Sequence, residues 1–259
     1  MRGRSAARIV AGAALLSGAL AGSLVGPVVQ GAYAAGGGDG CNPGRTDNYL
    51  HFYFAQAQDT PGSPDGGVQA DIHNYSPWVA KSDYGVTGWV GLGDSTTGSY
   101  AQIGWEEQPG SKRYTFVQFN DVPGGHFWNN LDASYPINST HDYKTLYDPN
   151  GNSGGKSGKY FTFWVDGSYI TGSQYNWTPN FDQSGTEIHT QASQIPGGSS
   201  NKELFSSMQY YYGGWKSGPQ SVYSRDGGTS GSGQSAGPSW DNVQAVTNGF
   251  NSWDSACTN

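Results

Sequence analysis

The chain has few charged residues, few helix-forming residues and no long apolar run beyond its first thirty-odd positions. Its 259 residues include 13 Lys+Arg and 20 Asp+Glu, so that charged residues make up 13% of the sequence. Leu, Glu, Lys and Ala, which fill long helices, are scarce after the N-terminal stretch. These absences exclude an all-helical protein and a coiled coil. We also expect no nucleic-acid partner, because phosphate recognition needs clustered Lys or Arg.

Glycine and aromatic residues are abundant instead. The chain contains 41 Gly, 9 Trp, 17 Tyr and 10 Phe, and an aromatic content of 14% excludes a disordered chain. Short apolar and aromatic runs alternate with clusters of Gly, Pro, Asn, Asp and Ser, which is typical of antiparallel strands joined by turns. We therefore predict an all-β fold, a single antiparallel β-sandwich of the jelly-roll or concanavalin-like kind over residues 48–259.

The same pattern predicts individual elements. Asp166-Gly167 lies between two apolar runs and predicts a hairpin turn, because both residues tolerate a positive φ angle. Apolar residues at helical spacing over 242–253 predict a short C-terminal helix. Strands are expected near residues 49–55, 67–72, 85–92, 99–105, 113–119, 143–147, 159–165, 168–171, 204–212 and 221–224.

The first 34 residues have the three parts of a secretory signal peptide. Three Arg residues precede an apolar, Ala-rich run over 9–29, and Ala32 to Ala34 supply the small-x-small cleavage pattern. We expect cleavage after Ala34, a Gly-rich spacer over 35–47, and a secreted, extracellular protein without a membrane anchor. The alternative, a retained anchor, is disfavoured by the Gly and Pro residues within the run. Cleavage would change the formal net charge from −7 to −10, since 1–34 hold three Arg and no acidic residue.

The two cysteines lie near the two ends of the chain that follows the signal peptide. We predict a disulfide between Cys41 and Cys257, which suits an oxidising compartment and implies that the two ends are neighbours. One alternative is a lipoprotein acylation site at Cys41, but Gly38 to Gly40 replace the Leu-rich segment that such a site needs. The other alternative is a pair of free thiols.

The motifs of common hydrolases and metal sites are absent or misplaced. The one Gly-x-Ser-x-Gly sequence, at 151–155, has neither the preceding strand nor the following helix of a nucleophile elbow. The five His residues form no His-x-x-x-His pair, and the cysteines are assigned to the disulfide. We therefore predict no metal site and no cofactor.

Glutamate is rare, so the candidates for a Glu-based catalyst are few. The whole chain contains only Glu106, Glu107, Glu187 and Glu203. Glycosidases with sandwich folds place two carboxylates on one strand or on facing strands. Glu106 could face Glu187 across a groove, and glycoside hydrolysis is one candidate function.

Alternation over 100–105 predicts a strand with two different faces. If its odd-numbered residues face the core, Tyr100 and Gln102 point to the opposite face. The next strand offers Tyr114 and Phe116 in matching positions. A Gln flanked by aromatic rings suits the stacking of sugars or the binding of an extended peptide. The alternative is that these rings only pack the sheet.

These segments resemble the glutamic peptidases, or eqolisins, whose fingerprint is an alternating strand, a Trp-Val-Gly segment, a Gln-x-Gly strand and a Tyr- and Trp-rich strand. The matching segments here are 68–72, Trp89 to Asp94 (WVGLGD), Gln102-Ile103-Gly104 and 114–119. The resemblance covers residues 68–119. It implies a secreted β-sandwich that hydrolyses polypeptides in acid with a Gln and a Glu.

The resemblance points to Gln102 and Glu187 as the catalytic pair, with Gln191 as the competitor of Glu187. In this interpretation Glu187 takes a proton from the attacking water and the Gln102 amide holds the oxyanion. The alternative is a non-catalytic module that binds carbohydrate or peptide through the same face. If Glu187 is not the catalyst, Glu106 is the next carboxylate to test. The residues expected to line the substrate groove are Trp89, Tyr100, Tyr114 and Phe116.

Overall fold

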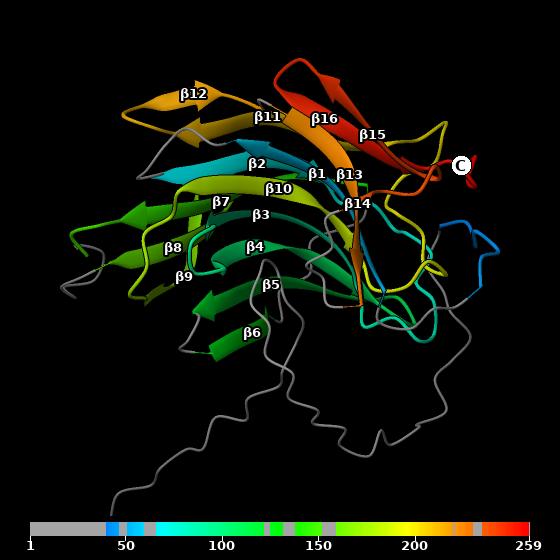
Figure 1. Cartoon of the computed structure of the whole chain (residues 1–259), viewed down its shortest axis with the longest axis horizontal. Coiled ribbons are helices and arrows are strands. Elements are labelled where there is room, and N and C mark those ends of the chain that lie inside the picture. The colour runs from blue at the N-terminus through cyan, green and yellow to red at the C-terminus, as the bar shows by residue number, and fades with distance from the viewer. Residues whose placement is uncertain are drawn as a thin grey trace, which may run out of the picture.

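The computed structural model describes residues 40–46, 51–59, 66–121, 125–131, 138–151, 159–219, 221–229 and 235–258. Over these residues the chain forms sixteen β-strands and no helix. The strands make two sheets in which neighbouring strands run antiparallel. Figure 1 shows these strands as the layers of one sandwich. The all-β, antiparallel sandwich predicted from the sequence is confirmed.

The first sheet, here sheet I, carries most of the sequence-predicted site residues. Its outer strands, β14 and β6, lie at opposite edges, and β10 and β3 pair in the middle. In spatial order its strands are β14 (Ser235–Ala236), β13 (Ser221–Gly228), β1 (Phe52–Asp59), β10 (Phe181–Ile188), β3 (Val86–Asp94), β4 (Ser99–Gln108), β5 (Lys112–Asp121) and β6 (Gly125–Leu131).

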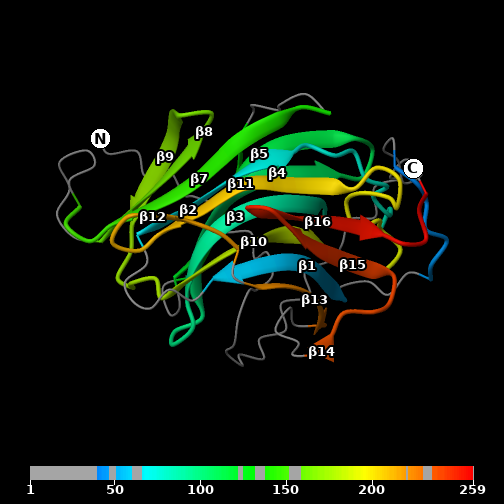
Figure 2. The ribbon, with the colours of Figure 1, turned by 90° about the horizontal axis from the view of Figure 1, so that it is seen from above.

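The second sheet, sheet II, lies across sheet I, as the view from above shows (Figure 2). Its spatial order differs from the sequence order, so it joins segments that are far apart along the chain. Its strands are β15 (Asp241–Val246), β16 (Gly249–Asp254), β11 (Glu203–Tyr211), β2 (Gly67–His73), β7 (Thr140–Asp148), β8 (Tyr160–Val165) and β9 (Ser168–Gln174), with β12 (Trp215–Ser217) paired to β11.

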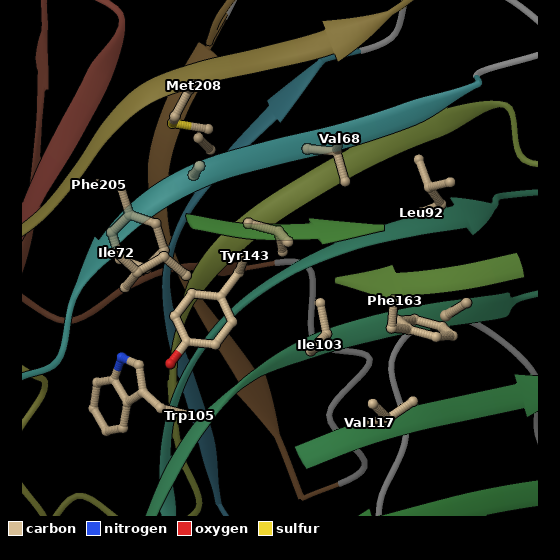
Figure 3. Packing of buried hydrophobic residues seen from close by; sticks show 14 of the residues in the cluster. Val68, Ile72, Leu92, Ile103, Trp105, Val117, Tyr143, Phe163, Phe205 and Met208 are labelled. Carbon is tan, nitrogen blue, oxygen red and sulfur yellow. The ribbon is translucent and has the colours of Figure 1, made fainter. Parts of the chain in front are cut away.

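The hydrophobic core fills the space between the two sheets. Sheet I contributes Ile103 and Val117, and sheet II contributes Tyr143 and Phe163, all completely buried. Figure 3 shows these side chains lying toward one another between the strands. Burial of apolar area at about 25 cal/mol per Å² is the main force that holds the sheets together. Period-two alternation therefore decides which face of each strand is available for function.

The turn predicted at Asp166-Gly167 is confirmed. Both residues have positive φ angles, 50° and 73°, and they join β8 to β9. All ten predicted strands overlap observed ones, but β6, β10, β12, β14 and the last hairpin were not predicted. The strand β10 is polar on both faces, so its sequence has no apolar alternation to detect.

The predicted C-terminal helix over 242–253 is wrong. The segment forms the hairpin of β15 and β16, with Asn248 at φ 52° in the connecting turn. Pairing of β16 with β11 buries Phe250, which stacks on Phe205 with a ring-centroid distance of 4.3 Å. Helical spacing was misleading because the strand period of two puts Val243 and Val246 on opposite faces: Val243 packs against the core and Val246 is exposed.

The Cys41–Cys257 disulfide is confirmed. The two sulfur atoms are 2.08 Å apart, and the bond joins positions separated by 216 residues. Arg45 fastens the same N-terminal segment by an ion pair with Asp254 and by a hydrogen bond from its Nε to the Gln191 carbonyl oxygen (2.6 Å). The predicted signal peptide, residues 35–39 and 47 of the spacer, and most of the Gly-x-Ser-x-Gly sequence lie outside the described residues. Within the described residues, no helix is long and apolar enough to cross a membrane.

Candidate active site

Sheet I has a second packed face, turned away from the core, which we call the site face. On β4, Ala101, Ile103 and Trp105 belong to the core between the sheets. Tyr100 and Gln102 therefore point to the site face, as the sequence alternation predicts. Both are buried there, at 3% and 2% exposed.

The four aromatic residues predicted for the binding surface all lie on the site face. Trp89, Tyr100 and Phe116 form one buried cluster together with Phe52 and Phe54 of β1. The fourth residue, Tyr114, is half-buried and lies opposite Glu106 in the pairing of β4 with β5. Three of the rings thus pack the floor of the site face, and Tyr114 is the most accessible of the four.

Gln102 does not face Glu187 in the sheet. Its partner on β3 is Gly91, and Gly91 pairs on its other side with Gln183 of β10. Gln102 and Gln183 therefore lie on either side of a glycine, with Cα atoms about 10 Å apart. Glu187 pairs with Thr87, which precedes Gly91 by four residues on β3. That offset puts the Cα atoms of Gln102 and Glu187 about 16 Å apart.

Gly91 is required where these two glutamines flank β3. A Cβ atom built at Gly91 would lie 2.7 Å from Cβ of Gln102 and 2.9 Å from the Ala101 carbonyl oxygen. Real Cβ contacts are essentially never so short, so any larger residue would displace β4. The glycine leaves a side-chain-free position between Gln102 and Gln183 in the middle of the site face.

Hydrogen bonds tie each of these glutamines away from Gly91. Gln102 Nε2 donates to Gln118 Oε1 at 2.6 Å, and Gln118 Nε2 donates to the Tyr100 hydroxyl at 2.8 Å. On the other side, Gln183 Nε2 donates to Gln58 Oε1 at 3.4 Å. The Tyr223 hydroxyl donates to the same Gln58 oxygen at 2.6 Å. Two rigid rows of neutral amides result, one on each side of β3.

Two glutamates share a different row of the site face. Thr87 of β3 pairs with Glu187 on one side and with Glu106 on the other. The Cα atoms of the two glutamates are therefore about 10 Å apart across one strand. Both side chains are buried, at 4% exposed for Glu106 and 5% for Glu187. The structure thus brings together the pair that the sequence analysis considered for a glycosidase.

A histidine, whose side chain is 11% exposed, contacts one member of this carboxylate pair. The His189 Nδ1 atom lies 2.9 Å from Asp83 Oδ1 and 2.7 Å from the Gly85 carbonyl oxygen. Its Nε2 atom lies 3.5 Å from Glu187 Oε1. The His189 backbone N–H also donates to Asp83 Oδ2 at 3.2 Å. Asp83 therefore fixes both the ring and the backbone of His189, and the ring faces Glu187.

Burial and charge set the protonation of the cluster in opposite directions. Burial raises the pKa of Glu106 from 4.5 to about 7, although Gln108, His189 and Asn130 act to lower it. Burial lowers the pKa of His189, but contacts with Asp83 and Glu187 outweigh it and raise that pKa well above 6.5. In mild acid the site therefore holds a neutral Glu106 and a cationic His189 beside Glu187.

Several buried polar atoms of the site face have no hydrogen-bond partner in the described part of the chain. They are Thr87 Oγ1, Trp89 Nε1, Glu106 Oε2, Gln56 Oε1, Asn120 Oδ1, and Nε and Nη2 of Arg225. All belong to strands of sheet I and to residues that alternate onto the site face. Other buried polar atoms without a partner, such as those of Asp241, lie elsewhere in the described structure. Because buried polar groups are normally paired, the atoms of the site face can receive a polar ligand.

Sequence reasoning missed four residues of this site: Asp83, His189, Gln183 and Arg225. Gln183 and His189 come from β10 and the segment after it, where no apolar pattern marks a strand. The available signal was the scarcity of His, since the chain has only five; no comparable signal marked Gln183. Gln191, considered as an alternative to Glu187, lies past the end of β10.

The described residues hold no cluster of three or more His, Cys, Asp or Glu side chains arranged to bind a metal ion. In the group of Asp83, His189 and Glu187, the two ring nitrogens of His189 contact the two carboxyl groups. What this site offers chemically is a proton donor, a carboxylate and several unpaired hydrogen-bond donors.

No protein-family model matches the chain, and no curated protein matches its sequence. Solved structures do match its fold. Scytalido-glutamic peptidase with a transition-state analog inhibitor is 9% identical at a TM-score of 0.54, covering 81% of this chain and 100% of that chain. SCP-B, a member of the eqolisin family, in complex with the tripeptide Ala-Ile-His, is 10% identical at a TM-score of 0.51 over the same shares. At these identities the likeness shows a shared fold alone.

Proposed function

We propose that the protein is an acid-acting hydrolase that cleaves polypeptides on the site face, with Glu187 and Glu106 as its catalytic carboxylates. One observation carries the proposal. The two glutamates flank Thr87 in one row, and their surroundings differ so that Glu106 holds a proton up to pH about 7 while Glu187 lies beside cationic His189. Pairs of groups with separated protonation are typical of acid–base sites.

The pair can carry out hydrolysis without further groups. Glu187 takes a proton from a water molecule as the water oxygen attacks the carbonyl carbon of the peptide bond. Glu106 gives its proton to the amide nitrogen as the C–N bond breaks. The water oxygen stays on the new carboxyl group, and the proton held by Glu187 returns to Glu106 through solvent. Asp83 acts as a positioning residue because it fixes His189.

Three features support a polypeptide as the substrate. The solved structures of similar fold include peptidases in complex with a peptide-based transition-state analog and with a tripeptide. The amide rows at Gln102 and Gln183 match the donors and acceptors of a peptide backbone. Gln102 is proposed to hold a backbone carbonyl of the substrate away from the cleaved bond, since it lies four residues from Glu106 on β4.

The test uses matched glutamate variants. An acid-denatured protein is incubated with the parent chain from pH 3 to pH 8, and new amino termini are counted. We expect cleavage that falls as the pH rises through about 7, because Glu106 then loses its proton. Glu106→Gln and Glu187→Gln should each lower kcat by about 100-fold or more. Equal activity of Glu106→Gln and the parent would refute the pair.

Glu203→Gln is the matched control. Glu203 is also buried and its pKa is also raised to about 7, but it lies on β11 of sheet II. Its variant should retain parental kcat within about twofold. Gln102 lies four residues from Glu106 on β4, about 13 Å along the strand, so Gln102→Ala should raise KM and leave kcat near that of the parent. A loss of about 100-fold in kcat would instead place the cleaved bond at Gln102.

A second candidate function, non-catalytic binding of a peptide or glycan, is favoured by the partner of Gln102. That partner across Gly91 is the neutral Gln183, so the middle of the site face holds no carboxylate. In this case the parent binds a peptide or an oligosaccharide at every pH and cleaves neither. Release of reducing ends from an oligosaccharide, with the same dependence on Glu106, would make the protein a glycoside hydrolase.

We propose further that the protein is secreted. The disulfide, which suits an oxidising compartment, supports this proposal together with the signal-like sequence of residues 1–34. Protein recovered from the medium should begin at Ala35 by amino-terminal sequencing. Recovery only inside the cell, with an intact Met1, would contradict it.

A further inference from the structure

Arg225 is a buried cation that the proposed chemistry does not use. It lies on β13, it is 7% exposed, and its Nε and Nη2 atoms have no hydrogen-bond partner in the described part of the chain. Every other Arg of the described residues, Arg45 and Arg113, makes an ion pair. An uncompensated buried charge costs several kcal/mol, so a group in this state indicates a missing anion.

The position of Arg225 connects it to the carboxylate pair. Arg225 pairs with Phe54 of β1, and Phe54 pairs with Glu187 of β10. The guanidinium carbon lies 4.4 Å from the Phe54 ring centroid, so the side chain extends over Phe54 along this row. Arg225, Phe54, Glu187, Thr87 and Glu106 therefore form one line across the site face.

The electrostatics of this line leave the guanidinium available. Burial lowers the pKa of Arg225, while the charges of Tyr223 and Glu187 raise it. Glu187 is close enough to act on Arg225 through charge, yet no ion pair joins these two residues in the described structure. The carboxylate of Glu187 instead contacts His189 at 3.5 Å. The fork of N–H donors on Arg225 thus remains free for a bidentate acceptor.

We infer that Arg225 binds a carboxylate group of the polypeptide substrate, a proposal that rests on the hydrolase function above. A carboxylate matches the planar fork of a guanidinium and accepts two parallel hydrogen bonds from it. The Cα atoms of Arg225 and Glu187 are about 10 Å apart across β1. An extended chain advances about 3.4 Å per residue, so the carboxylate lies within about three residues of the cleaved bond. It belongs either to an acidic side chain or to the C-terminal end of the substrate.

The experiment measures binding separately from cleavage. The probes are synthetic octapeptides of Ala, Phe and Gln with an amidated C-terminus, in which one Glu replaces one Gln at each position in turn, and one further octapeptide with a free C-terminal carboxylate. Binding is measured by calorimetry at pH 5.5 to the Glu106→Gln chain, which is not expected to cleave them. The same peptides are bound to the chain that carries both Glu106→Gln and Arg225→Gln.

We expect at least one carboxylate-bearing peptide to bind about tenfold or more tightly than the neutral peptide, as a charge-assisted pair implies. Arg225→Gln should reduce that ratio to about one and leave binding of the neutral peptide unchanged. Preference for a Glu position assigns the site to side chains, and preference for the free C-terminus assigns it to chain ends. Lys144→Gln, which removes a cation from sheet II, is the control and should keep the parental ratio.

Two results would overturn the inference: a carboxylate preference that persists in Arg225→Gln, or tight binding of oligogalacturonate in place of every peptide. Unfolding of Arg225→Gln does not confuse these results, because removing an unpaired buried charge should not lower the melting temperature. Selective binding by Arg225 without cleavage by the parent refutes the hydrolase and retains the carboxylate site. Cleavage by the parent without any carboxylate preference refutes the carboxylate site and retains the hydrolase function.

Discussion

The stability of the fold should depend on pH through Glu106, and Glu106→Gln should remove that dependence. The folded structure raises the pKa of this carboxyl from 4.5 to about 7 by burial. Below pH 4.5 the group is protonated in the folded and the unfolded chain, so it costs nothing. As the pH rises through about 7, the folded chain must ionise a buried group, and the stability present in acid is lost. A pKa difference of about 2.5 units, at 1.36 kcal/mol for each unit, corresponds to a loss of about 3 kcal/mol in the free energy of unfolding.

The assay is urea unfolding followed by Trp fluorescence at pH 4, 6 and 8, with the disulfide kept oxidised. Parent and Glu106→Gln should have similar free energies of unfolding at pH 4, since Gln resembles the protonated carboxyl. At pH 8 the variant should be more stable by about 3 kcal/mol. Groups common to both chains cancel in the difference. A difference that stays constant within about 0.5 kcal/mol from pH 4 to pH 8 would show that Glu106 is not buried as the structure has it, and would remove the proton donor from the proposed mechanism.

Two other results are expected. Gln183→Glu places a carboxylate opposite Gln102 across Gly91, four residues from the row of Glu187 and Glu106, so the variant should cleave peptides no faster than the parent in acid. Faster cleavage would place the peptide bond in the middle of the site face and contradict the proposed pair. Reduction of Cys41–Cys257 should lower the melting temperature by several degrees or more, because the bond closes a loop of 216 residues; an unchanged melting temperature in calorimetry after complete reduction contradicts this role.

Local sequence patterns predicted most of the strands of the fold. Strands such as β4 and β5 were predictable because the core requires an apolar residue at every second position, and the residues between them then point to the site face. The turn at Asp166-Gly167 was predictable because few residue pairs accept two positive φ angles. The disulfide followed from there being only two cysteines.

The composition of the site could be predicted only in part, because one of its strands, β10, has no apolar alternation. In β10 all eight residues are buried, yet polar side chains occupy both faces, so neither the strand nor Gln183 was recognised. The helix expected at 242–253 failed for a related reason. Its apolar residues have helical spacing, but in the hairpin of β15 and β16 they fall on both faces, with Val246 exposed and Phe250 buried, and the pairing of β16 with β11 decides the structure.

The sequence by itself determined the fold class, the disulfide and which residues of β4 leave the core, since each depends on neighbours in the chain or on a count of residues. The tertiary structure alone decided which residues face each other across β3. Register between strands far apart in the chain is set by the packing of two whole sheets, and a shift of one pair moves every partner. That register separates Gln102 from Glu187, sets Gln102 opposite Gln183, and places Glu187 in one row with Glu106 and Arg225.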